Sequence, residues 1–354
     1  MKNFRTFSLI LVLFLLFFIA GAVSGFSTAQ AKEDTFYKNK TMRILVCCSP
    51  GGFYDRWARL LARYMGNYIP GNPDIIVQNM PGAGGLIATN YVYNVAKKDG
   101  LAIVMPLGST YLDQVSGRKE VRFDWTKLQW LGTQEESSYV LYARADAPYN
   151  NIDDILKAKK PPKCGSSGTG SAGYIVPKVM EKTLGVKFKI ILGYPGGSEV
   201  DVSVERGEIS CRALTVPPHF GREPFISWHK RGFDKHIVQT GRTRDKRLLK
   251  TATIWELMDK YKTADLDRRM AKVILSSGAF GRPFAVAPGV PANRVKILRT
   301  AYAKSLKDPK LLSEAKRGKM DVKPSTGKQV QALANEVINQ PPEVIKGVLK
   351  ILGR

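Results

Sequence analysis

Four short glycine-rich turns constrain the fold of this chain more than any other feature of its sequence. Each turn follows an apolar, β-prone run and precedes a segment whose apolar residues repeat at helical spacing. The turns are loop 1 (residues 49–55), loop 2 (residues 81–85), loop 3 (residues 167–171) and loop 4 (residues 194–197). Strands that alternate with helices in this way predict an α/β protein, with mainly parallel sheets flanked by helices.

The alternation occurs twice along the chain, which predicts two lobes. The predicted strands are residues 42–48, 74–78 and 101–106 in the first unit, and residues 139–143, 188–192 and 209–216 in the second. A further strand at residues 282–287 returns the chain to the first unit, and the remainder is helical. We therefore expect lobe I to comprise residues 32–138 and 283–354, and lobe II to comprise residues 139–282.

Residues 1–31 are typical of an export signal. Lys2 and Arg5 precede the apolar stretch 7–22, and Ala29 and Ala31 supply the small residues of a cleavage site. A membrane anchor is the alternative, because the apolar stretch is nearly long enough to span a bilayer. The cleavage pattern favours removal near Ala31 and export to the periplasm.

The formal net charge of +25 suits an anionic partner or a solvated basic surface. Export and the lack of a recognition-helix motif or arginine–aromatic ladder argue against nucleic acid. A positive field that concentrates an anionic ligand is the more specific interpretation. The densest basic stretch, residues 229–250, is expected at the surface under either interpretation.

The spacing of cysteines and histidines does not predict a metal site. The cysteines are Cys47, Cys48, Cys164 and Cys211, and no CxxC pair occurs. One disulfide is possible in an oxidising compartment, but its connectivity is not determined by the sequence. The histidines are His219, His229 and His236, none of which are four residues apart. We expect neither a metal nor a cofactor.

The four loops are candidate ligand-binding sites. In open α/β sheets, ligands bind where the carboxyl ends of strands meet the amino ends of helices, and helix amino ends favour anions. Glycine also lets backbone N–H groups approach a ligand closely. A tight turn is the simpler explanation for one loop, but four loops in two lobes favour binding. The predicted ligand-binding residues are Ser49, Pro50, Gly51, Gly52, Phe53, Tyr54, Asp55, Pro81, Gly82, Ala83, Gly84, Gly85, Ser109, Ser167, Gly168, Thr169, Gly170, Ser171, Tyr194, Gly196 and Gly197.

The sequence offers little support for an enzyme. Residues 168–173 match the dinucleotide fingerprint GxGxxG, but the following strand carries no acidic residue at its end to hold a ribose. No Walker loop or GxSxG nucleophile elbow is present, and the scattered histidines suggest no catalytic base. An exported hydrolase that uses Ser171 or Cys164 is the alternative to a binding protein, and we expect no catalytic residue.

Several sequence blocks, in the same order, resemble those of one family. These blocks are residues 46–59 (VCCSPGGFYDRWAR), 79–85 (NMPGAGG), 98–100 (KDG), 193–197 (GYPGG), 205–208 (ERGE), 281–283 (GRP), 287–291 (APGVP) and 308–309 (DP). The chain resembles the substrate-binding proteins of tripartite tricarboxylate transporters, also called Bordetella uptake proteins. The first two blocks form the specific pair.

The resemblance implies a type II periplasmic-binding fold, a Venus flytrap whose two lobes close on a ligand by a hinge motion. In such proteins loops 1 and 2 clamp one end of the ligand, and loop 3 holds a carboxylate. Asp55 would order loop 1 or meet a donor group of the ligand. A simple acid at a helix amino end is equally compatible with its position.

The implied function is that of a monomeric periplasmic receptor. It would capture a small carboxylate and deliver it to the membrane subunits of a tripartite tricarboxylate-type transporter. A sensor subunit that docks to a membrane kinase is the alternative. Cys47 and Cys48, Cys211 and an extended segment at residues 219–250 depart from the family pattern, and they leave the identity of the ligand open.

Overall fold

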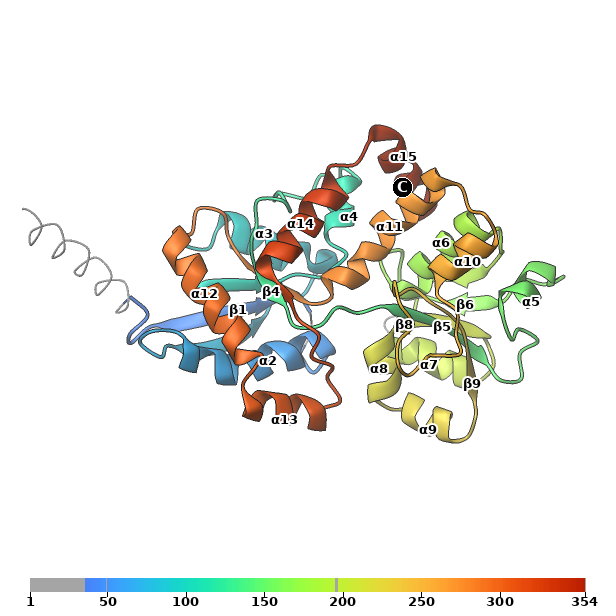
Figure 1. Ribbon diagram of the computed structural model, residues 1–354, viewed down its shortest axis with the longest axis horizontal. Coiled ribbons are helices and arrows are strands. Elements are labelled where there is room, and N and C mark those ends of the chain that lie inside the picture. Colours follow the sequence, from blue (N-terminus) through green and yellow to red (C-terminus); the bar gives the residue numbers. More distant parts are fainter. Residues whose placement is uncertain (1–35, 49, 195–196, 354) are drawn as a thin grey trace, which may run out of the picture.

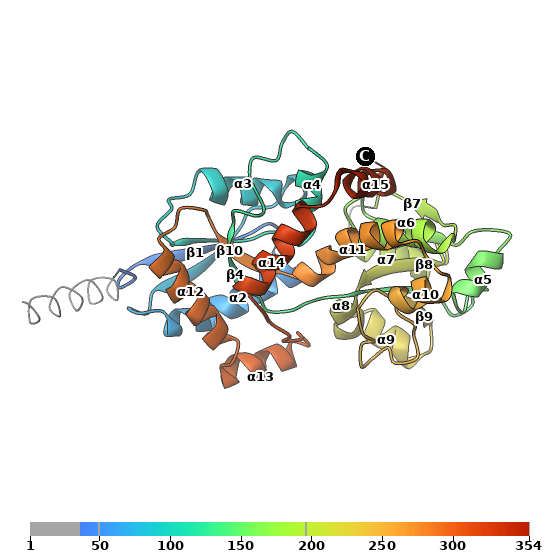
Figure 2. The ribbon, with the colours of Figure 1, turned by 45° about the horizontal axis from the view of Figure 1, so that its top comes forward.

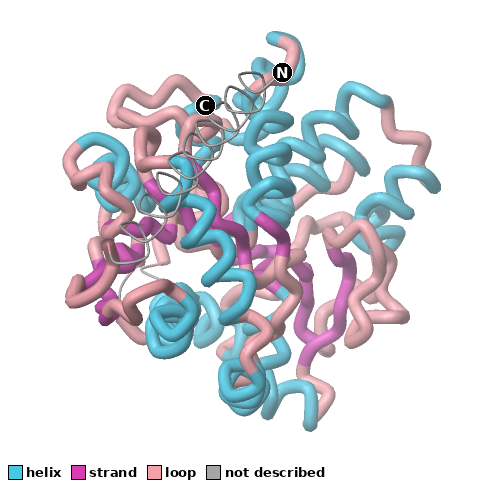
Figure 3. Tube along the Cα trace, turned by 60° about the vertical axis from the view of Figure 1, so that its left-hand side comes forward, coloured by secondary structure: helices cyan, strands magenta, loops and turns pink. Residues whose placement is uncertain are grey.

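The computed structural model describes residues 36–48, 50–194 and 197–353. The predicted signal segment, its cleavage site near Ala31, and the predicted site residues Ser49 and Gly196 lie outside these ranges. Within them the chain forms two lobes, each built on its own sheet (Figure 1). Helices surround the strands of both sheets (Figure 3).

The first sheet has the strand order β11-β4-β10-β3-β1-β2. Its strands are β1 (Thr41–Val46), β2 (Asp74–Asn79), β3 (Ala102–Met105), β4 (Gln129–Thr133), β10 (Pro283–Val286) and β11 (Ser325–Thr326). Strand β1 pairs in parallel with β2 and β3, whereas β10 is antiparallel to β3 and β4. Because β1 lies between β3 and β2, with helices packed on it, Met42, Ile44, Leu45 and Val46 are all fully buried.

The second sheet has the strand order β7-β6-β8-β5-β9. Its strands are β5 (Tyr139–Arg144), β6 (Lys163–Gly165), β7 (Lys189–Ile191), β8 (Cys211–Thr215) and β9 (Asp234–Gln239). Strand β6 is parallel to β7 and β8, and β5 is antiparallel to β8 and β9. Cys164 and Cys211, which face each other on β6 and β8, form a disulfide.

Helices cover both sheets (Figure 2). Helix α2 packs on β1 and β2, α3 on β1 and β3, and α6 on β8, while the C-terminal helix α15 packs on α11 and α6. The helices are α2 (Phe53–Met65), α3 (Leu86–Asn94), α4 (Tyr111–Val115), α5 (Ile152–Lys157), α6 (Ala172–Leu184), α7 (Gly197–Glu205), α8 (Val216–Gly221), α9 (Phe225–Lys230), α10 (Ile254–Lys260), α11 (Asp265–Phe280), α12 (Ala292–Ser305), α13 (Pro309–Arg317), α14 (Gly327–Ile338) and α15 (Pro342–Leu352), with 3-10 turns at η1 (Gly66–Tyr68) and η2 (Ala83–Gly85).

The predicted α/β class with two lobes is confirmed, but the sheets are mixed rather than mainly parallel. Strand β10 follows helix α11, which returns from the other lobe, so β10 enters the first sheet against the direction of β3. Strands β4, β6, β9 and β11 were not predicted. Strand β9 lies in the stretch 229–250, where Ile237, Val238 and Leu248 are buried, so the prediction that this stretch is surface is wrong in part.

Two segments join the first sheet to the second, residues 134–138 and residues 278–282, and we call them the crossing segments. Buried Arg282 forms an ion pair with buried Glu135 at 2.7 Å, and Trp57 donates its indole N–H to the same carboxylate oxygen at 3.0 Å. Burial raises the pKa of Glu135 despite the Arg282 charge. The amide of Ser137 donates to the carbonyl of Gly278 at 2.9 Å. The crossing segments are therefore bound to each other along their length.

Replacement of Gly281 by alanine should destabilise the protein strongly. A Cβ atom there would overlap the carbonyl oxygen of Glu135, and the φ of +58° is unfavourable for other residues. We expect the free energy of unfolding in urea to fall by about 3 kcal/mol.

Gly185→Ala is the matched control. Gly185 also has a positive φ (+73°), but its Cβ would meet no atom within 4 Å. We expect the free energy of unfolding of this variant to fall by only about 1 kcal/mol, because alanine is strained in the left-handed conformation. Equal losses in the two variants would show that the contact between the crossing segments is not tight.

Candidate functional site

A cavity of about 210 Å³ lies in the second lobe, between loops 3 and 4. Gly165 to Ser167, Ser171 to Gly173 and Gly197 contribute to its lining, together with Arg212 to Thr215 of β8 and Tyr139 of β5. The carboxyl ends of β6 and β8 and the amino ends of α6 and α7 meet there. This is the position at which open α/β sheets bind ligands.

Loop 3 presents hydroxyl and amide groups to this cavity. The hydroxyls of Ser166 and Ser171 lie 2.7 Å apart, and both donate to the carbonyl of Gly168, at 2.9 and 3.0 Å. Ser171 is the N-cap residue of α6, but its side chain makes no capping bond. The first amides of α6 consequently lack an intrahelical partner and can bind an anion.

Arg212, which lines the cavity, belongs to a cluster of charges around buried Asp201. The guanidinium of Arg212 pairs with Asp201 and donates to the carbonyl of Gly197 at 2.8 Å. Arg222 binds the same Asp201 carboxylate at 2.8 Å. Burial lowers the pKa of Arg212 to about 10, so this side chain remains charged at neutral pH. Two cations around one carboxylate leave a net positive charge beside the cavity.

Loop 1 is held by Asp55. The buried Asp55 carboxylate accepts the amide of Gly51 at 2.8 Å and pairs with Arg59 at 2.9 Å. Arg59 also donates to the Asn79 side chain at 3.1 Å, and Asn79 donates to the carbonyl of Cys48 at 2.8 Å. These bonds tie loop 1 to the end of β2, where loop 2 begins. Asp55 thus orders the loop, one of the two roles that the sequence suggested.

Loop 1 also contacts the crossing segments. The phenol of Tyr54 donates to the carbonyl of Gly281 at 3.0 Å and accepts the amide of Gly108 at 3.2 Å. The guanidinium carbon of Arg282 lies 4.7 Å from the centre of the Phe53 ring. Phe53, Tyr54 and the neighbourhood of Ser109 therefore lie at the junction of the lobes.

Loop 2 has an unusual backbone. Gly82, Ala83, Gly84 and Gly85 all have positive φ, from +47° at Ala83 to +127° at Gly82. A Cβ atom at Gly84 would meet nothing within 4 Å, whereas one at Gly82 would lie 2.6 Å from the Ile87 side chain. Backbone conformation, rather than crowding, requires glycine at Gly84. Residues 81–84 are exposed.

The structure brings together only part of the predicted site. Ser167, Ser171 and Gly197 line the cavity of about 210 Å³, and the Tyr194 ring lies beside Gly165. Thr169 and Gly170 are exposed on loop 3 and do not line that cavity. Loops 1 and 2 also line no part of it. Their residues Pro50, Gly51, Gly52, Pro81, Gly82, Ala83 and Gly84 are exposed, so their association with loop 3 remains a prediction.

Sequence reasoning missed Arg212, Thr215 and Tyr139 as cavity-lining residues. Arg212 follows Cys211 within an apolar strand, and a lone arginine in such a strand was the available signal. The candidate hydrolase residue Cys164 is held in the disulfide. The three histidines lie together elsewhere and line neither this cavity nor the larger one described next.

A larger cavity of about 600 Å³ lies beside the crossing segments. Residues 240–247 and 321–323 form much of its lining, with Ser137 and Val216. Most of its cationic groups are paired: Arg247 binds Asp245 and Asp321, Arg244 binds Glu256, and Lys272 binds Glu336. The sequence did not predict this cavity.

Comparison with known proteins identifies a family. The model described as "Tripartite tricarboxylate transporter family receptor" matches residues 58–349. No curated protein matches the chain. Within the described residues, no helix has both the length and the apolar character needed to cross a membrane.

Solved structures share the fold. A TctC solute binding protein from Polaromonas is 22% identical with a TM-score of 0.66, over 89% of this chain and 99% of its own. An adipate-bound Rhodopseudomonas palustris protein is 18% identical with a TM-score of 0.63, over 89% and 97%. Malate-bound MatC from the same organism is 17% identical with a TM-score of 0.62, over 86% and 99%. These likenesses confirm the two-lobed α/β fold.

The Asp55→Ala variant should loosen loop 1. It removes the acceptor of the Gly51 amide, so we expect the free energy of unfolding to fall by about 1 kcal/mol and the Gly51 amide to exchange faster. Burial alone would raise the pKa of Asp55, but bonds from Arg59 and Gly51 outweigh it and the pKa is lowered. The stabilisation that the ionised Asp55 carboxylate gives to the folded protein is therefore fully present above the ordinary pKa of about 4. It is lost as the pH falls through the lowered pKa of the folded protein.

Arg59→Ala is the control for this prediction. The Arg59 side chain is half exposed but its partner Asp55 is buried, so the loss of Arg59 should lower the free energy of unfolding by about 1 kcal/mol while the Gly51 amide stays bonded to the carboxylate. Amide exchange measured by mass spectrometry follows both variants. If Arg59→Ala releases the Gly51 amide as fully as Asp55→Ala does, the carboxylate is not what orders loop 1.

Proposed function

This chain belongs to the tripartite tricarboxylate transporter family of receptors, and from that premise we propose that it captures a small carboxylate between its lobes. In this proposal it delivers the ligand to the membrane subunits of a transporter of that type. We propose the periplasm as its location and a monomer as its working form, with residues 1–31 removed on export. The family consists of receptors, and the proposal assigns no catalytic residue.

The cavity at loop 3 is the observation that carries this proposal. It combines serine hydroxyls, free amides at the start of α6 and a buried cluster with net positive charge. Hydroxyl and amide donors bind carboxylate oxygens, and a charged acceptor roughly doubles the strength of such bonds. The field of two arginines around Asp201 favours an anion at the same place.

A dicarboxylate fits the two-lobed arrangement. One carboxylate would bind at loop 3, and loops 1 and 2 would meet the other end after the lobes close. Two related structures carry malate and adipate, and both of these ligands are dicarboxylates. The backbone of Gly84 is exposed, and a Cβ atom there would meet nothing within 4 Å, so a ligand can approach this part of loop 2 closely.

The larger cavity is the less suitable carboxylate site. Arg244 and Arg247 are engaged with carboxylates of the protein itself, and Arg242 lies over the ring of Trp255. An incoming anion would have to displace these partners or share them. It contains none of the glycine-rich loops of the predicted site. Lys246, which lines it, allows a direct test of this alternative.

A thermal-shift screen of the purified exported protein against C4 to C6 dicarboxylates tests the proposal. A ligand at about 100 times its dissociation constant should stabilise the folded protein by roughly 2.7 kcal/mol. Calorimetry with the best ligand should then show an affinity about ten- to a hundred-fold lower for Ser171→Ala, because a charge-assisted hydrogen bond is lost.

Two control variants accompany the calorimetric test. Ser313→Ala changes an exposed serine of α13 and should bind as tightly as the unmodified protein. Lys246→Ala should alter the salt dependence of binding more than its strength at physiological salt. If Lys246→Ala abolishes binding while Ser171→Ala does not weaken it, the ligand occupies the larger cavity and the proposed site is incorrect.

A further inference from the structure

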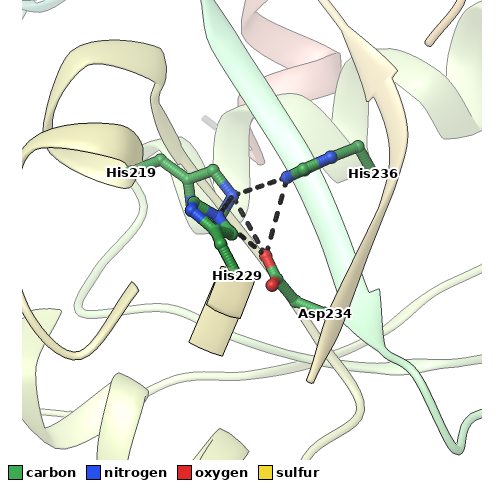
Figure 4. A group of neighbouring side chains, drawn as sticks. All are labelled: His219, His229, Asp234 and His236. Carbon is green, nitrogen blue, oxygen red and sulfur yellow. Dashed lines mark hydrogen bonds and ion pairs between the residues drawn. The ribbon is translucent and has the colours of Figure 1, made fainter. Parts of the chain in front are cut away.

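All three histidines of the chain meet at one point on the second lobe, together with an aspartate (Figure 4). His219 lies on α8, His229 on α9, and Asp234 and His236 on the edge strand β9. The side chains of His219 and Asp234 are fully buried, while those of His229 and His236 are 23% and 22% exposed. We call these four residues the histidine cluster.

The four inward-pointing atoms form a compact group. The Nε2 atom of His219 lies 2.9 Å from Nε2 of His236 and 3.2 Å from Nε2 of His229. Oδ2 of Asp234 lies 3.2 Å from the Nε2 atom of His219, 3.3 Å from that of His229 and 3.6 Å from that of His236. In the sixth pair, the ligand nitrogens of His229 and His236 lie within 4.8 Å of each other.

These separations fit a tetrahedron around a single ion. Bonds of 2.0–2.1 Å to zinc place tetrahedral ligands about 3.3 Å apart. Neighbouring ligands in an octahedron with the same bonds would be about 2.9 Å apart, and four of the five measured separations exceed that value. A square plane requires two opposite pairs at about 4 Å, but five of the six pairs are 3.6 Å or less.

The chemistry of the group also calls for a cation. Among the described contacts, the Asp234 carboxylate has only histidines as charge partners, and a buried carboxylate needs positive charge nearby. Neutral imidazole nitrogen and carboxylate oxygen are ordinary zinc ligands.

Packing holds the rings in this orientation. Tyr142 of β5 stacks on His219 with ring centres 5.0 Å apart, and Phe225 lies 4.7 Å from it. Within the described residues, Nδ1 of His219 has no hydrogen-bond partner, so aromatic contacts rather than a hydrogen bond fix this ring. The convergence of all three Nε2 atoms is consequently a product of tertiary packing.

We propose that His219, His229, Asp234 and His236 bind one Zn²⁺ ion through three Nε2 atoms and one carboxylate oxygen. Four protein ligands complete a tetrahedron and leave no open position, which is typical of a structural rather than a catalytic zinc site. The ion joins α8 and α9 to the edge strand β9. Val216, the first residue of α8, lines the larger cavity, and the preceding Thr215 lines the smaller one.

Zinc binding is tested on the full exported protein after removal of metal with EDTA. Titration with Zn²⁺ in competition with a chromophoric chelator should give one site per chain, and thermal shift should show stabilisation by Zn²⁺. Co²⁺ in place of zinc should give the intense visible absorption of tetrahedral cobalt. Absence of a stoichiometric Zn²⁺ site, or weak octahedral cobalt absorption, would overturn the proposal.

Variants locate the ion. His229→Ala and His236→Ala change partly exposed ligands, so the fold should survive, as circular dichroism will verify. Loss of an outer-sphere partner of a metal ligand already costs 10–100-fold in metal affinity, so each variant should lose about 100-fold or more. Glu205→Gln is the control, because Glu205 binds Trp228 and Arg231 in the same region without being a ligand.

The control should retain the affinity of the unmodified protein for Zn²⁺. Unchanged affinity in both histidine variants would place the ion elsewhere and refute the assignment. The carboxylate screen is independent of this test, since no cluster residue lines the cavity at loop 3. The zinc site can therefore fail while the receptor function holds, and the reverse is equally possible.

Discussion

The close contact between the two crossing segments is the constraint on which the arrangement of the lobes depends. At Gly281 the chain passes so near the Glu135 carbonyl that no side chain fits, and Gly278 approaches Ser137 in the same way. The buried pair of Glu135 and Arg282 neutralises two charges that burial would otherwise penalise heavily. Both connections between the sheets are thereby held together at one narrow place.

The candidate binding surfaces are attached to this place from both sides. In the first lobe, Tyr54 of loop 1 bonds to Gly281, and the Phe53 ring lies against Arg282. In the second lobe, Tyr139 lines the cavity at loop 3 and bonds through its hydroxyl to Ser277, next to Gly278. A ligand that draws the lobes together would act on side chains already in contact with the crossing segments.

Charge is used differently in the two cavities. Around Asp201, largely buried Arg212 and partly exposed Arg222 share one carboxylate, so the site keeps a positive excess without a cation that projects freely. In the larger cavity, most arginines are matched by carboxylates of the protein. The overall charge of +25 therefore says little about where an anion binds. The balance between cations and carboxylates near each cavity decides where an anion binds, because exposed charges farther away are screened within about 8 Å at physiological salt.

The sequence by itself determined the α/β class, the two units and the positions of the glycine turns. Hydrophobic periodicity and glycine are local signals, and β1, α2, β2, α3 and α6 form close to where they were predicted. It also suggested the family, because short motifs such as residues 46–59 carry a specific pattern. The resemblance to that family also suggested Asp55 as a residue that orders loop 1 or meets a donor group of the ligand.

Tertiary structure alone decided how distant residues meet. Strand β9 begins with polar residues at a sheet edge, so it has no apolar run to predict it. Arg212 lines the cavity because its guanidinium reaches across to Gly197 and Asp201 of α7, and Cys164 meets Cys211 because β6 and β8 are neighbours. The sequence did not predict that the histidines are neighbours, because the local signal for a shared metal site is ligand spacing within one helix, and they lack it. They converge from α8, α9 and β9, and no local pattern records contacts made across the fold.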